Sequence, residues 1–362
     1  DMKKRFGDER RTEIQSVTGE VDIEDLIPVE ECVVTYTNNG YMKRMPVDVY
    51  KTQRRGGRGV SGMKQREEDF VSEMFISSSH DHILFISNKG IMYRLKCYEI
   101  PEGSKTSRGY NIVNLLPLSD GEKIAAMLRV SDFEDGKYVI MVTKNGKIKR
   151  TALSAYKNVR KNGLIAIGLD EDDEIAGVRL TDGNARLFVA TRNGMALRMQ
   201  ETDVRPMSRS AHGVRAIKLR EGDCVVSMAR EREGATLLTV TENGYGKRTD
   251  LDEYRITNRG GKGVKTINVT EKTGKLISIQ AVTDDNDLMI INRSGLTIRT
   301  AVSQIRLAGR ATQGVRIINL RDGDAIASVM AVPAAGDEEE VQSAEAAENG
   351  AATPEAGQPA EE

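Results

Sequence analysis

The sequence predicts an all-β protein: a six-bladed, propeller-like disc of four-stranded blades, followed by a disordered acidic tail. A pattern of about fifty residues occurs six times along the 362-residue chain, and each copy contains four short β-type runs separated by glycine turns. The composition agrees with this prediction. The chain has 34 glycines for tight turns, no Trp and only 4% aromatic residues, so its core must consist mainly of aliphatic side chains.

The first two runs of each repeat form a predicted β-hairpin. A β-rich run leads into a turn that ends in glycine, and four of the six turns are Asn-Gly, the strongest short hairpin signal because both residues accept a positive φ. Successive turn glycines are 50, 56, 48, 50 and 51 residues apart, which establishes the repeat. The turn glycines are Gly40, Gly90, Gly146, Gly194, Gly244 and Gly295.

The second half of each repeat supplies two more predicted strands. A second glycine follows the first after 19 residues, or after 17 in the third repeat, and an alternating run such as 214–219 or 315–320 comes next. A fourth β-run, such as 70–77, closes the repeat. Because a four-stranded sheet cannot bury both of its faces alone, neighbouring blades must stack into a disc.

A column of basic residues follows the hairpin turns. An arginine lies four residues after every turn glycine, and a lysine precedes that arginine in three repeats. Evenly spaced cations are candidate phosphate contacts. The residues two positions before the arginines are apolar or small, so a second role, capping the edge of a blade, stays open. The column comprises Arg44, Arg94, Arg150, Arg198, Arg248 and Arg299, with Lys43, Lys149 and Lys247 beside them.

A loop of about ten residues between the second and third predicted strands concentrates further positive charge. Loop glycines allow close backbone approach, and arginine forks bind phosphate oxygens. Six such loops around a disc would form a basic rim, and double-stranded DNA carries about one charge per 1.7 Å of its axis. We therefore expect duplex DNA to wrap around the rim without sequence specificity. The loop residues are Gln53, Arg54, Arg55, Gly56, Gly57, Arg58, Gly59, Lys105, Arg108, Arg160, Lys161, Arg209, Arg259, Lys262 and Arg310.

Charge also divides the chain into parts. Residues 337–362 hold nine acids and no basic residue, so 53 basic residues face 45 acidic ones in 1–336, a net charge of +8, although the whole chain has −1. We expect 1–31 to be a charged entry segment, 32–332 to form the disc, and 333–362 to be a disordered tail. The acids of the tail would compete with an anionic partner.

The sequence gives little support to catalytic, metal or membrane functions. Three scattered cysteines (Cys32, Cys97 and Cys224) fit a reducing cytoplasm, and the three histidines are not clustered as metal ligands. No apolar run approaches the about 18 residues of a membrane helix. Glycine-rich stretches at 57–62 and 260–266 look like nucleotide-binding loops, but no helical periodicity follows them. We expect no cofactor, no small-molecule substrate and no catalytic residue in this chain.

The loop sequence QRRGGRG at 53–59 matches in all seven residues the signature box of the C-terminal domain of the DNA gyrase A subunit. Residues 6–14 and 39–44 also resemble this type IIA topoisomerase family, and the resemblance covers residues 1–332. It implies a β-pinwheel, a propeller-like disc whose neighbouring blades exchange strands. It also implies that the box is needed to wrap DNA with positive handedness. The third repeat departs from the pattern, because it is two residues shorter and has Val159 in place of a cation.

The resemblance also implies how such a domain is used. In the family, two A and two B subunits form an A2B2 assembly that introduces negative supercoils by ATP-dependent strand passage, in the cytoplasm and on the nucleoid. The cleavage tyrosine belongs to a breakage-reunion domain, from which residues 1–31 would be the linker, and ATP and Mg²⁺ belong to other domains or subunits. This chain is therefore expected to be non-catalytic alone.

Two other functions stay open at this point. The first is the C-terminal domain of the A-type subunit of topoisomerase IV, a decatenating enzyme with a related but degraded pinwheel, against which the intact box argues. The second is a propeller that acts as a protein-interaction scaffold. A scaffold would show no steep dependence of DNA binding on salt, whereas a DNA-wrapping domain would.

Overall fold

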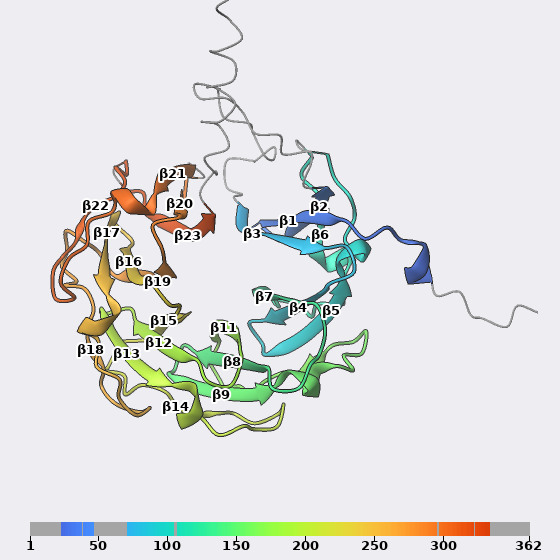
Figure 1. Cartoon of the computed structure of the whole chain (residues 1–362), viewed down its shortest axis with the longest axis horizontal. Coiled ribbons are helices and arrows are strands. Elements are labelled where there is room, and N and C mark those ends of the chain that lie inside the picture. The colour runs from blue at the N-terminus through green and yellow to red at the C-terminus, as the bar shows by residue number, and fades with distance from the viewer. Residues whose placement is uncertain are drawn as a thin grey trace, which may run out of the picture.

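Six antiparallel sheets lie in a ring, as Figure 1 shows. The computed structural model describes residues 23–37, 39–46, 71–104, 107–294, 297–321 and 323–333. Five sheets have four strands, and the sixth has three strands among these residues. No α-helix occurs in the described residues, where short 3-10 helices connect the strands, and no helix there is long and apolar enough to cross a membrane. The predicted all-β, six-bladed propeller is confirmed.

From the centre of the ring outward, the strands follow the same order in every blade, and the sixth blade has the first three positions of that order among the described residues. The first three blades are β3(Val71–Ser78)-β1(Glu31–Thr37)-β2(Tyr41–Pro46)-β6(Tyr110–Asn111), β7(Ile124–Val130)-β4(His82–Ser87)-β5(Ile91–Lys96)-β10(Leu164–Ile165) and β11(Ile175–Thr181)-β8(Tyr138–Thr143)-β9(Lys147–Ala152)-β14(Val214–Arg215). The last three blades are β15(Val225–Arg230)-β12(Arg186–Thr191)-β13(Met195–Gln200)-β18(Val264–Lys265), β19(Leu276–Val282)-β16(Thr236–Thr241)-β17(Tyr245–Asp250)-β22(Val315–Arg316) and β23(Ile326–Pro333)-β20(Asn286–Asn292)-β21(Thr297–Ala301).

The outermost strand of each four-stranded blade comes from the next repeat. β14, for example, belongs to the fourth repeat but pairs with β9 of the third blade, through Val214 opposite Ile148. The exchange of strands that the resemblance implied is therefore present. The exchanged strand is shorter than the alternating run predicted, because the chain leaves the sheet after two residues and the Ala216 N–H donates to the carbonyl of turn residue Gly146 at 2.8 Å.

A 3-10 turn follows the third strand of most blades. These turns matter below because their carbonyl groups lie next to the basic column. They are η3(Cys97–Glu99), η5(Leu153–Tyr156), η6(Glu201–Asp203), η7(Leu251–Glu253) and η8(Val302–Gln304), with η4(Ile112–Asn114) after β6.

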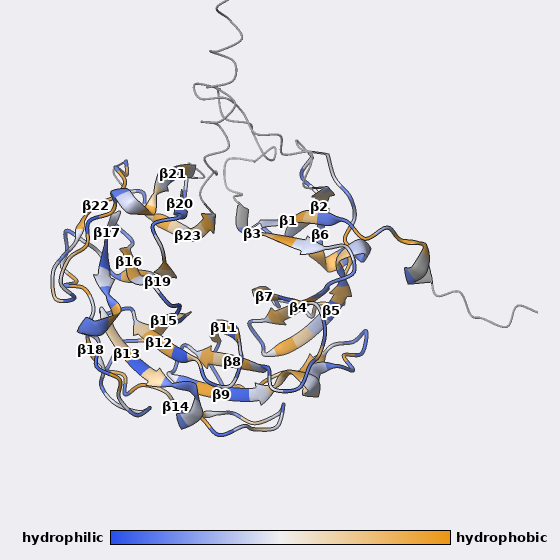
Figure 2. Cartoon of the chain, viewed as in Figure 1, coloured by the Kyte–Doolittle hydropathy of each residue, from blue (hydrophilic) through white to orange (hydrophobic). Residues whose placement is uncertain are grey.

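The hydrophobic core lies between neighbouring blades. Leu84 and Ile86 of β4 pack in one cluster with Val139 and Met141 of β8, and all four side chains are fully or almost fully buried. Figure 2 shows the apolar residues along central strands such as β4 and β8. Aliphatic faces on both sides of each sheet require a neighbour on each side, so stacking of blades stabilises the disc, as expected from the repeat.

The regions that flank the disc are only partly described. In the predicted linker, η1(Ile23–Leu26) lies against the second blade, where the Glu24 carboxylate accepts from the Lys96 ammonium at 2.7 Å. Residues 1–22 and the tail from 334 onward lie outside the described residues. The boundaries 1–31, 32–332 and 333–362 stay predictions.

Candidate nucleic-acid interface

Five pieces of chain cover the outer edges of the first five blades, each supplied by the repeat that follows. We call them the outer segments. Each begins four residues after the first residue of a 3-10 turn, passes along the third strand of the preceding blade, and ends in the short exchanged strand. In Figure 1 the exchanged strands β14, β18 and β22 lie on the perimeter of the ring. The outer segments are residues 101–111, 157–165, 205–215, 255–265 and 306–316.

The second glycine of each repeat lets the outer segment close onto its blade. Gly213 has a φ of +83°, and a Cβ there would lie 2.6 Å from the carbonyl oxygen of Ile148. Gly263 has a φ of +70° and would meet the Ala196 carbonyl oxygen at 2.6 Å. Only glycine tolerates both this backbone conformation and this contact, so the fixed spacing of the glycines follows from the attachment of the outer segments.

The arginine column lies beneath the outer segments and holds them. Arg198 on β13 donates to the carbonyl oxygens of Leu251 and Tyr254 at 2.8 and 3.0 Å, and its guanidinium pairs with Glu231 at 2.7 Å. The Arg198 side chain is 6% exposed. Its backbone also forms a parallel β-bridge to Ile256 in the outer segment. Arg198 therefore attaches the next repeat to its own blade.

Four other arginines of the column repeat this arrangement, and Arg299 of the sixth blade, which no outer segment covers among the described residues, does not. Arg44 donates to the Ile100 carbonyl at 2.9 Å and pairs with Glu30, and Arg248 donates to the Ile305 carbonyl at 2.8 Å. Arg150 pairs with buried Glu201, Arg94 donates to the Lys157 carbonyl at 2.6 Å, and Arg299, which is half exposed, pairs with Asp287. Of the two roles left open by the sequence, the geometry matches capping of the blade edge.

The three lysines of the column are also internal. Lys43, Lys149 and Lys247 are 0% exposed, and their ammonium groups donate to backbone carbonyls of the loops that cover them, among them those of Ser104, Arg209 and Gly309. Burial lowers the pKa of Lys149 to about 7 and that of Lys247 to about 8. The expectation that these lysines contact DNA is corrected here: buried side chains whose donors are used internally do not reach a phosphate.

The cations of the loops themselves lie at the surface. Arg160, Lys161, Arg209, Arg259 and Lys262 are exposed, while Arg108 and Arg310 are partly buried. Within the described part of the chain none of these side chains has an acidic partner within salt-bridge distance. The Arg108 guanidinium lies 3.5 Å from the ring centre of Tyr41, which orients it. Residues 53–59 and Lys105 lie outside the described residues.

Sequence reasoning missed two further sets of surface cations. Lys157, Arg205, Arg255 and Arg306 are exposed at the first position of their outer segments, and Arg215, Lys265 and Arg316 are exposed at the last. Aligning the repeats on their second glycine places Arg205, Arg255 and Arg306 in one column and Arg215, Lys265 and Arg316 in another, which was the signal available in the sequence.

Alignment on that glycine extends the pattern to residues 51–61 of the first repeat. The six aligned stretches contain 19 basic residues and one acidic residue, Glu102. Beneath the outer segments Arg44, Arg150, Arg198 and Arg248 of the arginine column pair with carboxylates, so the excess of positive charge lies in the outer segments.

We call the outer segments together the belt, and backbone contacts at their ends join the third, fourth and fifth of them. The Gly260 N–H donates to Ala216 O at 2.6 Å, and the Asn268 N–H donates to Thr312 O at 3.0 Å. Side chains add to these contacts: Arg259 donates to Arg215 O at 3.3 Å and Arg310 donates to Lys265 O at 3.4 Å. The surface cations of these three segments are therefore mounted on a connected edge and not on independent loops.

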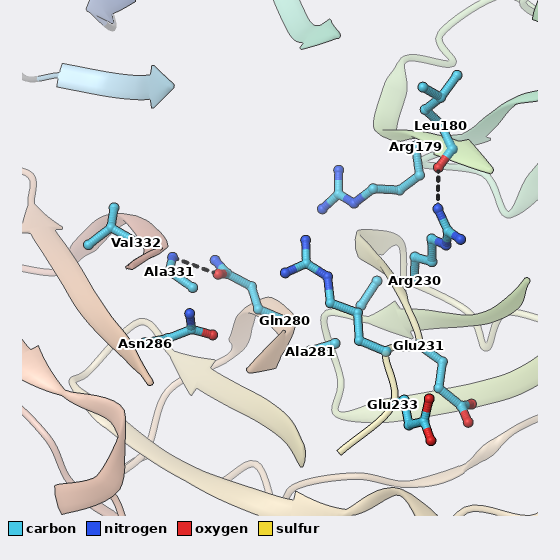
Figure 3. Close-up of a pocket in the computed structure, with 12 residues that line it drawn as sticks. Arg179, Leu180, Arg230, Glu231, Glu233, Gln280, Ala281, Asn286, Ala331 and Val332 are labelled. Atoms are coloured by element: carbon cyan, nitrogen blue, oxygen red, sulfur yellow. Dashed lines mark hydrogen bonds between the residues drawn. The ribbon is translucent and has the colours of Figure 1, made fainter. Parts of the chain in front are cut away.

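The centre of the ring offers a different kind of site. A cavity of about 810 Å³ is lined by residues of β11, β15, β19 and β23, shown in Figure 3. Its polar groups largely bind one another: Arg230 donates to Leu180 O and to Asp182, and Gln280 accepts from the Ala331 N–H at 2.9 Å. The cavity also contains both signs of charge, so it lacks the excess of one sign found on the perimeter.

Comparison with known proteins identifies the repeat. The family model of the DNA gyrase C-terminal domain, a beta-propeller, matches all six copies: residues 33–78, 81–131, 137–182, 185–230, 235–283 and 286–333. The DNA gyrase A subunit of Halalkalibacterium halodurans is 54% identical over 338 residues, which are 93% of this chain and 41% of that protein. The corresponding protein of Clostridium acetobutylicum is 46% identical over 345 residues. The chain thus spans about 41% of the length of these relatives.

Two solved structures share the architecture. A DNA gyrase A C-terminal domain superposes with a TM-score of 0.70 at 29% identity, covering 83% of this chain and 99% of that one. A DNA topoisomerase IV C-terminal domain superposes with a TM-score of 0.72 at 27% identity, covering 89% of this chain and 99% of that one.

Proposed function

Since the chain belongs to the DNA gyrase C-terminal domain family, we propose that it binds duplex DNA without sequence specificity and wraps it around the belt of outer segments. The observation that carries this proposal is the charge of the belt: its five outer segments hold 15 basic residues against one acidic residue. Exposed cations that are not paired with carboxylates can neutralise DNA phosphates. Release of the counterions from those phosphates drives binding.

The shape of the belt supports wrapping over straight binding. Cations recur around the perimeter of a disc, so a straight duplex touches few of them and a curved duplex touches many. Smooth bending of 20–30 bp by 40–90° costs on the order of 1–6 kcal/mol, which additional phosphate contacts must offset. The ties between neighbouring outer segments keep the edge rigid, so the DNA has to adapt to the protein.

In the assembled enzyme we propose the role that the family implies. The wrapped segment, with positive handedness, would be presented to the gate formed by the rest of the A subunit, and the A2B2 assembly with the B subunit would pass it through to introduce negative supercoils. This chain would contribute binding and orientation and no chemical step. ATP and Mg²⁺ would act on other domains or subunits, in the cytoplasm and on the nucleoid.

A second candidate is a topoisomerase IV C-terminal domain, favoured by the TM-score of 0.72 to such a structure. Both candidates would bind DNA through the belt. They would differ in the pinwheel, which is expected to be degraded in a topoisomerase IV domain. The intact QRRGGRG box at 53–59 and cations in every aligned stretch favour the gyrase role.

Duplex binding measured across salt concentrations tests the proposal. We expect the logarithm of the association constant to fall linearly with the logarithm of the salt concentration, with a slope of about −0.9 for each phosphate neutralised. A flat dependence would instead support a protein-interaction scaffold.

A further inference from the structure

Three exposed apolar side chains occupy the same place in three successive outer segments. Pro206, Ile256 and Leu307 are each the second residue of their segment. Ile256 is 44% exposed and Leu307 is 55% exposed. Single exposed apolar residues are common on protein surfaces. Their recurrence in register, on a perimeter that otherwise carries cations, indicates a partner with both charged and apolar surfaces.

The backbone around each of these side chains is fixed to the blade beneath it. Each residue forms a parallel β-bridge to an arginine of the column. In the fourth blade Ile256 bridges to Arg198, and the next residue, Thr257, donates its N–H to the Arg198 carbonyl at 2.9 Å. The apolar side chains are therefore presented from the rigid edge of a sheet, which suits insertion into a partner better than a mobile loop does.

An exposed arginine precedes each apolar residue. Arg205, Arg255 and Arg306 are all exposed, and none of them has an acidic partner within the described part of the chain. The pair at each position is thus a guanidinium beside a proline or an aliphatic side chain. Architectural proteins that bend DNA combine these two elements: arginine enters the minor groove, and an apolar wedge enters a base step from that groove.

We propose that Pro206, Ile256 and Leu307 are wedge residues that insert between base pairs from the minor groove and kink the wrapped duplex. This rests on the proposed DNA binding and adds how the bend is made. The insertion covers an apolar side chain with base faces, which offsets part of the cost of unstacking. In the first two outer segments the same position holds Glu102 and Asn158. The kinks should therefore be confined to the third, fourth and fifth blades.

The test uses the full chain with all three wedge residues changed to serine (P206S, I256S, L307S) and every cation retained. Permanganate, which oxidises unstacked thymines, is applied to a bound duplex of about 150 bp. We expect several enhanced thymines with the unaltered chain and their loss in the triple variant. The linking-number change per bound protein on a relaxed circle should fall at least twofold. A control variant changes two exposed apolar residues outside the belt (I76S, V113S), and it should behave like the unaltered chain.

The outcomes separate this inference from the proposed function. A duplex of about 20 bp, too short to wrap, reports the cation contacts, so its affinity and salt slope should be the same in all three proteins. If the unaltered chain binds this duplex without a salt slope, the proposed function itself fails. If the salt slope is present but no thymine is enhanced, or the triple variant wraps as well as the unaltered chain, the wedge proposal is overturned.

Discussion

At Lys149 and Arg209 two cations with different roles lie together. The Lys149 ammonium is buried and donates to the backbone carbonyl of Arg209, while the Arg209 side chain is exposed. Spacing along the sequence does not separate these roles, because both residues recur at fixed intervals. Burial separates them. Packing requires Arg198 at its place beneath the outer segment, whereas the exposed Arg209 side chain lies where an external anion can reach it.

Lys149 makes stability depend on pH in a predictable direction. Burial lowers its pKa from 10.5 to about 7 in the folded protein. Between these two values the unfolded chain binds a proton that the folded protein does not, so the free energy of unfolding rises with pH. Compared with Lys149→Met, the unaltered chain should gain stability from pH 7 to pH 10, by up to about 1.4 kcal/mol per pH unit. Urea unfolding of both proteins measures this difference, and a constant difference contradicts burial of the charge.

At the scale of elements, the sequence predicted most of the blade and misplaced its outer edge. The hairpins appeared because Asn-Gly turns and β-branched runs are local signals, and β12 with β13 forms where expected. The run at 214–219 looked like a full strand of its own blade. Only Val214 and Arg215 pair, and their partner β9 belongs to the preceding repeat. A pattern of alternation does not reveal which sheet a strand joins, since that is decided by tertiary packing.

The attachment of an outer segment should depend on its glycine. Gly263→Ala places a Cβ 2.6 Å from the Ala196 carbonyl oxygen at a φ of +70°. Gly222→Ala is a matched control, because its φ is +69° and its Cβ would meet nothing within 4 Å. The control should lose about 1 kcal/mol of unfolding free energy from backbone strain alone. Gly263→Ala should lose about 1–3 kcal/mol more from the clash.

Hydrogen exchange locates this loss. In Gly263→Ala the amides of Thr257 and Thr266, which donate to Arg198 and Gly194, should exchange faster, because these bonds hold the outer segment to the fourth blade. Equal stability and equal protection in the two variants would show that the glycine is not what closes the segment.

For the whole molecule, neighbouring blades hold each other in two ways. Aliphatic clusters fill the space between sheets, and each outer segment reaches back to cover the preceding blade. The net charge of the chain, −1, concealed a strongly basic belt, because acids are concentrated in 337–362 and in ion pairs beneath the surface. The position of this excess charge on a curved edge, and not its amount, is what favours bending of a stiff polyanion.

The most direct measurement is the linking number of a closed circular DNA relaxed by a topoisomerase in the presence of the chain. Wrapping around the belt should give a positive shift that grows with bound protein. Neutralising unpaired belt cations (R205Q, R209Q, K262Q) should reduce the shift strongly. Neutralising ion-paired cations elsewhere (K137Q, K144Q, R186Q) should leave it unchanged. No shift with the unaltered chain, or an equal loss in both variants, would contradict wrapping around the belt.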